Sequence, residues 1–326
     1  MNVRRLIPTA AIAGAVTLGM VALSACSSSD AAEPKSGGKL AVTASFYPMQ
    51  FLAERIGGGH VSVTTLTRPG VEPHDLELKP RQTARLGEAD VILYLKGVQP
   101  AVDKAIAQSG VENVVDATTL TTMEKHGTEA GGHGHGGDEH SGDDHTAEET
   151  GTEGNDPHIW LDPVKYAEVA KGVGAGLEKA DPAHAAAYRK NTAALVAELD
   201  GLNTEFRQGL AHTSTKTFIT THAAFGYLAE RYGLEQEAIA GIDPESEPTP
   251  ARIKELETIA ERDKVGTIFF ETLASDKTAK TLAGDSGLKT DVLDPLEGIT
   301  DRSKGDDYLE VMRSNLGALR TALGAK

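Results

Sequence analysis

Five side chains with metal-binding chemistry follow predicted strands or lie in the connection between the two halves of the chain. They are His74, His158, His222, Glu271 and Glu297. Imidazole nitrogens and carboxylate oxygens suit a borderline-soft cation, and three histidines with one carboxylate can form a tetrahedral zinc site. Each residue alone also fits a structural role, as a loop histidine bonded to backbone or a glutamate that pairs with a lysine or caps a helix. Ligands from separate loops have no fixed sequence interval, so spacing leaves both interpretations open.

His158 lies in a stretch from Asn155 to Pro163 that contains the only tryptophan of the chain, Trp160, between two Asp-Pro steps. Proline restricts its own backbone and that of the residue before it. Such a stretch can simply fix a connection between two lobes. We interpret it instead as a rigid mount at the lobe boundary, because the other candidate ligands lie in comparable loops.

Strands that alternate with helices must position these residues, and the pattern occurs in both halves of the chain. Periodicity predicts strands over 39–44, 61–66, 90–95 and 111–116, and again over 216–220, 234–240, 265–270 and 289–293. Such alternation is typical of parallel sheets flanked by helices. Ligands bind beyond the carboxyl ends of parallel strands. The predicted fold class is therefore α/β, with two lobes and the candidate site in the cleft between them.

The lobes are expected over residues 39–181 and 213–326, joined by a long rigid helix over 182–212. Pro182 suits the first turn of that helix, and apolar residues recur at near-helical spacing as far as Leu210. A helix of this length extends about 40 Å, which is enough to lie across both lobes.

Residues 1–25 are predicted to be a lipoprotein signal peptide. A short basic region precedes a mostly apolar run, and small residues lead to Cys26. An uncleaved membrane helix is the alternative, since about 20 apolar residues can span a bilayer. The polar residues after Cys26 favour cleavage and lipidation there, with residues 26–38 as a tether. Cys26 is the only cysteine, so a metal site must use imidazole and carboxylate.

An acidic, histidine-rich stretch precedes the stretch from Asn155 to Pro163 that contains His158. Residues 124–156 carry ten acids and one lysine, a net charge of −9 in a chain of formal charge −16. Residues 121–155 contain few apolar side chains and are not expected to fold alone. This acidity favours cations over nucleic acid as partners. We predict weak auxiliary metal capture, rather than a merely solvated linker, by the histidines of the stretch: His126, His133, His135, His140 and His145.

Four motifs, in order, resemble the zinc solute-binding lipoproteins of ABC transporters (ZnuA-like, cluster A-I). They are Glu72–Pro80, Asp156–Pro163, Thr221–Tyr227 and Leu293–Glu297, and the resemblance covers nearly the whole mature chain. The histidine-rich acidic insertion before the second motif also resembles the zinc branch of this family.

The resemblance implies a metal held between the lobes by His74, His158 and His222. Glu297 matches the position where many relatives place a fourth carboxylate, although some zinc relatives use water there, and Glu271 is our second candidate. Manganese relatives tend to have a carboxylate in place of the third histidine, so His222 favours Zn(II). The family's rigid connecting helix matches the predicted linking helix. It implies that the two lobes close only to a limited extent when the metal binds.

The resemblance also implies a function. We expect a monomer, anchored by lipid on the extracytoplasmic face of the cell membrane, that captures Zn(II) and delivers it to an ABC permease, and that is not an enzyme. A manganese- or iron-binding protein of the same family is the closest alternative. A secreted zinc hydrolase is a weaker one, because the sequence contains no His-Glu-x-x-His helix.

Hydrogen-bond partners must fix the orientation of ligating imidazoles, and we expect Asp75 and Asp162 to be such partners. Because the ligands must be deprotonated, zinc affinity should fall as the pH drops. The remaining histidines, His60, His184 and His212, are expected to be structural or surface residues.

Overall fold

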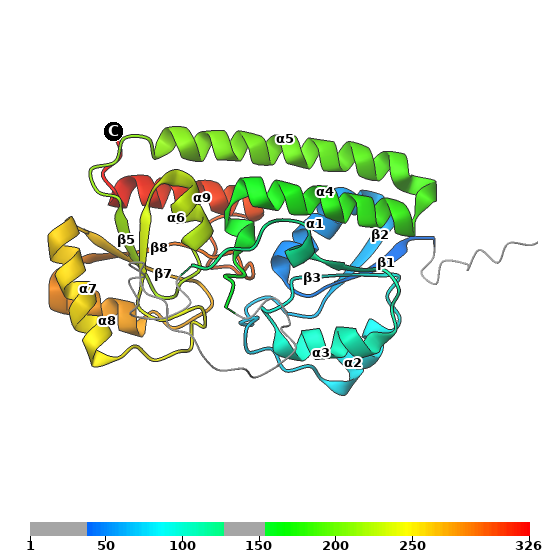
Figure 1. The fold of residues 1–326 in the computed structure, drawn as a ribbon, viewed down its shortest axis with the longest axis horizontal. Coiled ribbons are helices and arrows are strands. Elements are labelled where there is room, and N and C mark those ends of the chain that lie inside the picture. The colour runs from blue at the N-terminus through cyan, green and yellow to red at the C-terminus, as the bar shows by residue number, and fades with distance from the viewer. Residues whose placement is uncertain (1–37, 127–153) are drawn as a thin grey trace, which may run out of the picture. The chain divides into compact units, whose positions relative to one another are not determined.

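The computed structural model describes residues 38–126 and 154–326. The predicted signal peptide, Cys26 and nearly all of the tether lie outside the described residues, as do His133, His135, His140 and His145. The chain forms two sheets flanked by helices (Figure 1). Within the described ranges each sheet has four strands, in the orders β2-β1-β3-β4 and β6-β5-β7-β8. Every strand pair is parallel. The predicted α/β class with two lobes is confirmed.

The N-terminal sheet consists of β1 (Leu40–Ala44), β2 (Val61–Thr65), β3 (Val91–Tyr94) and β4 (Val114–Asp116). Its helices are α1 (Tyr47–Gly57), α2 (Pro80–Leu86) and α3 (Pro100–Ser109). Each of these helices has proline at its first or second position, where the missing N–H costs no helical hydrogen bond.

The C-terminal sheet repeats this order with β5 (Thr217–Thr220), β6 (Glu235–Ala238), β7 (Thr267–Phe270) and β8 (Lys289–Val292). Its helices are α6 (Gly226–Tyr232), α7 (Pro250–Asp263), α8 (Lys277–Ser286) and α9 (Tyr308–Ala322). The Thr249 hydroxyl caps α7 by accepting from the Arg252 N–H, as the Thr-Pro pair indicates.

Alternate residues of the strands pack into different cores, as a pleated strand requires. In β3, Val91 and Leu93 belong to one large apolar cluster with α1, while Ile92 faces α2 and α3 on the other side. In β5, Phe218 joins the same large cluster, and Ile219 packs with α7 and α8. The large cluster therefore runs under both sheets.

Two long helices lie along this shared core (Figure 1). They are α4 (Pro163–Ala180) and α5 (Ala185–Gly209), and α5 contacts α1, α4 and α9. The predicted linking helix differs at its start, where Pro182–His184 form a 3-10 turn. The Asp181 carboxylate holds that turn, because it lies 2.7 Å from both His184 Nδ1 and the Tyr188 hydroxyl.

No helix within the described ranges is both long enough and apolar enough to cross a membrane.

In each sheet the second strand in space is the first in sequence, so the chain crosses over to opposite sides of β1 and of β5. Ligands bind at such switch points, beyond the carboxyl ends of the strands. The loop after β2 carries His74, and the loop after β5 carries His222. Glu271 directly follows β7, and Glu297 lies in the segment after β8.

Candidate metal centre

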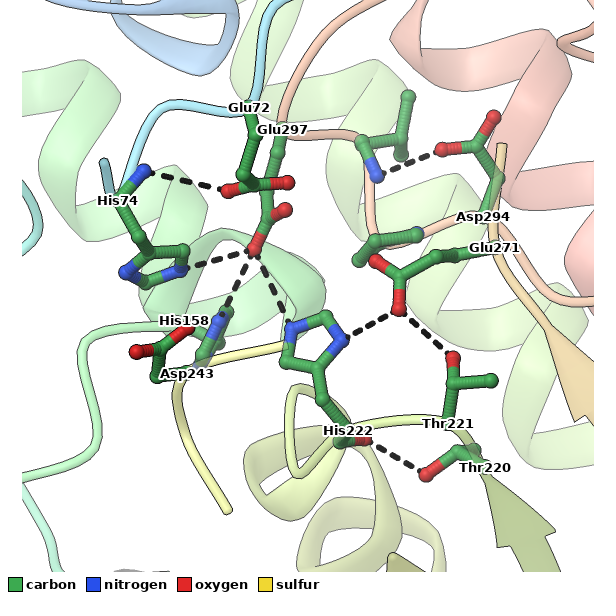
Figure 2. A network of polar contacts seen from close by, with 12 residues as sticks. Glu72, His74, His158, Thr220, Thr221, His222, Asp243, Glu271, Asp294 and Glu297 are labelled. Atoms are coloured by element: carbon green, nitrogen blue, oxygen red, sulfur yellow. Dashed lines mark hydrogen bonds and ion pairs between the residues drawn. The ribbon is translucent and has the colours of Figure 1, made fainter. Parts of the chain in front are cut away.

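Three imidazole nitrogens converge on one carboxylate oxygen between the two sheets. His74 Nε2 and His158 Nε2 each lie 3.2 Å from Glu297 Oε1 (Figure 2). His222 Nε2 lies 3.4 Å from the same oxygen. All four ligand atoms lie within 4.8 Å of one another. The structure thus brings together the three histidines that the resemblance implies as ligands, with Glu297, one of the two candidate carboxylates, beside them.

These separations match the edge of a zinc tetrahedron. Ligands 2.0–2.2 Å from a central Zn(II) at tetrahedral angles are about 3.3–3.6 Å apart. The three distances to Glu297 Oε1 are 3.2, 3.2 and 3.4 Å. The three edges that meet at Glu297 Oε1 therefore have the length that a zinc-sized ion requires, and the other ligand atoms lie within 4.8 Å of one another.

The four side chains are withdrawn from solvent to different degrees. Side-chain exposure is 0% for His158 and Glu297, 1% for His222 and 10% for His74. Removal from water strengthens charge interactions among them. His74 is the candidate ligand that remains in contact with solvent.

Two buried carboxylates orient the histidines from behind. Asp156 Oδ1 lies 2.7 Å from His158 Nδ1 and accepts from the His158 backbone N–H at 2.9 Å. Glu271 Oε1 lies 2.8 Å from His222 Nδ1 and accepts from the Thr221 hydroxyl at 2.7 Å (Figure 2). Such partners fix the tautomer and ring angle of a metal-binding histidine.

The predicted orienting partners were wrong. The Asp162 carboxylate caps α4 through the Val164 N–H and forms an ion pair with Arg231 at 2.6 Å. Asp75 is exposed and makes no hydrogen bond to a ligand ring within the described ranges. Asp156, and not Asp162, orients His158, because the backbone turn before His158 brings the Asp156 carboxylate back onto the ring.

Charge balance at the centre depends on a shared positive charge. Burial by itself lowers the pKa of His158 and of His222. Asp156 and Glu297 outweigh burial at His158 and raise its pKa. Glu271 and Glu297 do the same at His222, whose pKa lies well above the ordinary range. Burial raises the pKa of Glu297, but the His222 charge and the hydrogen bonds from the three histidines lower it well below its usual value.

The tautomers have a direct consequence for cation binding. When Asp156 and Glu271 hold the Nδ1 protons of His158 and His222, each neutral ring presents an Nε2 lone pair to the Glu297 carboxylate. Lone pairs that face each other repel unless a cation or a proton lies between them. The centre therefore requires positive charge, and protons compete with a metal for the same nitrogens.

Side chains of the C-terminal lobe brace the turn that carries Glu297. Leu296 has a φ of +59°, which is unfavourable for a bulky side chain. The Asp294 carboxylate stabilises this turn by accepting from the Leu296 N–H at 2.9 Å, and Asn315 bonds the backbone of Asp294 at 2.7 and 3.0 Å.

Trp160 holds the same turn from the side of His158. The Trp160 indole N–H donates to the Pro295 carbonyl at 2.7 Å, and its ring packs edge-on against Phe46 at 5.0 Å. Trp160 is fully buried, and its ring lies 5.1 Å from the His158 ring. Trp160 thus contacts both His158 and the turn that carries Glu297, which agrees with the rigid mount expected for the stretch from Asn155 to Pro163.

Glu72 also lies at the site, although the predictions made from the sequence do not include it. Its carboxylate accepts from the His74 N–H at 3.2 Å and gathers with those of Glu271 and Glu297 (Figure 2). Burial, with the Glu297 charge second, raises the pKa of Glu72 to about 9. Glu72 lies two residues before His74, just as Asp156 lies two residues before His158. This spacing is the feature of the sequence from which Glu72 could have been predicted.

The other candidates lie outside this centre. Glu271 approaches the back of His222 and is not among the four converging ligands. His126 meets a different carboxylate cluster. The rings of His60 and His184 stack at 4.1 Å, and His212 is exposed. These three histidines are structural or surface residues, as predicted.

Comparison with known proteins places this geometry in a family. Residues 42–322 match the family described as zinc-uptake complex component A, periplasmic (ZnuA). The chain is 36% identical to the high-affinity zinc uptake system protein ZnuA of Bacillus subtilis, over 94% of this chain and 95% of that protein. It is 35% identical to the zinc-binding lipoprotein AdcA of Streptococcus pneumoniae, over 91% of this chain.

The match to AdcA covers 58% of that longer protein. The crystal structure of the Zn(II)-bound ZnuA-like domain of S. pneumoniae AdcA superposes with a TM-score of 0.70 at 31% identity, over 88% of this chain and 99% of that domain.

Proposed function

Because this chain belongs to the ZnuA family of zinc-uptake components, we propose that it binds Zn(II) outside the cytoplasm and delivers it to an ABC permease. The ligands would be His74, His158, His222 and Glu297. The convergence of their four ligand atoms, with three nitrogens at the distance of a zinc tetrahedron edge from Glu297 Oε1, is the observation that carries the proposal. The zinc-binding and zinc-uptake names of the relatives agree with this cargo.

The family is a transport component, and the ligand set supports binding without turnover. Catalytic zinc sites keep a coordination position for water, whereas closed sites use four protein ligands. Here four protein ligands converge, and three of them are at most 1% exposed. A zinc hydrolase is therefore the weaker hypothesis for the function of this protein.

The exposure of the ligands suggests the route that zinc takes. His74 is the most exposed of the four and lies in a loop between β2 and α2. His158 and Glu297 are held by Trp160 and the turn at Leu296. We infer that zinc enters and leaves beside His74, and that displacement of the His74 loop opens the site for delivery.

The proposed setting of the protein follows from its sequence. Lipidation of Cys26 would anchor a monomer on the extracytoplasmic face of the cell membrane, close to the permease. His126, His133, His135, His140 and His145 would capture zinc weakly, and tethering would give them an effective concentration near the cleft of about millimolar.

Zinc titration of metal-free protein against a competing chelator tests the proposal. We expect one tight site, strongly weakened in His222→Ala and unchanged in His212→Ala, because His212 is an exposed histidine of the same chain. Metal analysis of protein purified without added metal provides the second test. Retention of manganese or iron in preference to zinc would overturn the choice of cargo, and turnover of ester or peptide substrates would revive the hydrolase.

A further inference from the structure

A second group of ligand atoms lies beside the candidate centre. His126 Nε2 is 2.7 Å from Glu230 Oε2 and 3.8 Å from Glu124 Oε2. One ligand atom from each of the three residues lies within 4.8 Å of the others. Glu124 and His126 precede residues 127–153, whereas Glu230 belongs to α6 in the other lobe.

A fully buried carboxylate connects this group to the first one. Asp156 Oδ1 binds His158 Nδ1 at 2.7 Å, and Asp156 Oδ2 lies 3.3 Å from His126 Nδ1. Asp156 is 0% exposed, and among the residues described its Oδ2 accepts no hydrogen bond, so its contact with His126 Nδ1 is an ion-pair distance. With Asp156 behind Nδ1, the His126 Nε2 faces the two glutamates, as in carboxylate–histidine–metal arrangements.

The backbone around His126 is firmly held. The Asp156 N–H donates to the Glu124 carbonyl at 2.8 Å. The Tyr227 hydroxyl accepts from the Glu124 N–H at 2.8 Å and donates to the Asp156 carbonyl at 2.9 Å. Gly226 leaves room for the histidine, since a Cβ at position 226 would meet His126 Cβ at 2.2 Å. The ring position is thus determined by packing.

We propose that Glu124, His126 and Glu230 form a second, weaker site for a divalent cation, coupled to the first site through Asp156. One imidazole and two carboxylates suit Zn(II) and leave a coordination position for water. The identification of Zn(II) as its cargo rests on the proposed function, whereas the site itself rests on this cluster.

Two features make the second site weaker than the first. The Glu230 side chain is 60% exposed, so binding must immobilise it against solvent. The Lys165 ammonium lies 2.6 Å from Glu124 Oε1, which leaves Oε2 for a cation but places a positive charge close by. A cation at this site would therefore dissociate readily toward the tighter site.

Coupling follows from the shared carboxylate. A cation on His126 Nε2 draws the Nδ1 proton of that ring toward Asp156, whose other oxygen holds the Nδ1 proton of His158. Occupancy of one site must then alter affinity at the other by the same factor in both directions.

Zinc titration of the intact chain, followed through the imidazole ¹⁵N signals, tests the second site. The signal that His126→Asn removes should remain near its metal-free position at one equivalent of zinc and move with the second. Glu230→Gln should require at least about tenfold more free zinc for this movement. Glu261→Gln, which changes an exposed glutamate at the end of α7, should behave as the unsubstituted protein.

The outcomes separate the two proposals. If the His126 signal moves at the same free zinc in Glu230→Gln and Glu261→Gln, the second site is refuted and other histidines account for the extra binding. If Glu230→Gln abolishes the first step as well, the second site is also refuted, because Glu230 then supports the first. If the unsubstituted protein lacks the first step but the His126 signal still moves, the proposed function fails and the second site stands.

Discussion

Replacement of Glu271 by glutamine distinguishes an orienting carboxylate from a zinc ligand. Glu271 Oε1 contacts His222 Nδ1 at 2.8 Å and the Thr221 hydroxyl at 2.7 Å, and the residue is 3% exposed. Glutamine keeps the size and one acceptor oxygen but removes the charge. The variant therefore tests the charge behind His222 with little change in packing.

The expected loss of zinc affinity is about 10–100-fold, the range for partners that orient a metal ligand. This equals about 1.4–2.7 kcal/mol of binding free energy. The loss should depend on pH. Burial lowers the pKa of His222, and Glu271 with Glu297 raises it well above the usual value, so removal of the Glu271 charge lowers this pKa again.

The sign of the pH effect follows from proton competition. At pH 6, His222 in the metal-free native protein holds a proton that zinc must displace, and in Glu271→Gln it holds that proton less strongly. The affinity difference between the two proteins should therefore be smaller at pH 6 than at pH 8.5.

The assay is competition with a chelator of known zinc affinity at both pH values, with Glu297→Gln and Glu261→Gln measured in parallel. Glu297→Gln removes a charge that points at three Nε2 atoms and should cost more than Glu271→Gln at both pH values. Glu261→Gln should cost nothing. If Glu271→Gln loses as much affinity as Glu297→Gln throughout, then Glu271 is a direct ligand and our assignment of the fourth position is wrong.

Three further predictions concern the whole protein. Zinc affinity should fall as pH drops, starting above the ordinary histidine pKa of about 6.5, because the pKa values of His158 and His222 are raised; calorimetry that shows constant affinity from about pH 5 to 7.5 contradicts this. Trp160→Phe leaves the Pro295 carbonyl without its indole donor and should lower the free energy of unfolding by about 1–3 kcal/mol, measured by denaturant titration. Zinc affinity should fall as well. Unchanged values for both quantities would show that Trp160 does not brace the site. Deletion of residues 127–153, with a short glycine link, should slow loading at scarce zinc in stopped-flow measurements but preserve tight binding at equilibrium, since the four ligands lie elsewhere; loss of tight binding would show that the site is misplaced.

The residues that make up the centre could be selected from the sequence because parallel strands deliver their following loops to one edge of a sheet. His74 and His222 follow β2 and β5, and Glu297 follows β8, as the alternation of strands and helices predicts. Local patterning also located the long helix α5, since apolar side chains recur at the helical period. The family resemblance supplied the grouping of these loops into one site.

Only the tertiary structure decided which acidic residue is a candidate ligand, which orients a histidine and which caps a helix. Asp156 and Asp162 both flank His158, but a turn returns the Asp156 carboxylate to the ring, while Asp162 caps α4 and pairs with Arg231. Glu271 and Glu297 both follow strands, yet the left-handed backbone of Leu296 accompanies the turn that presents Glu297 to the Nε2 side. Sequence patterns specify which element a side chain leaves from, whereas its direction depends on backbone angles and packing that distant residues determine.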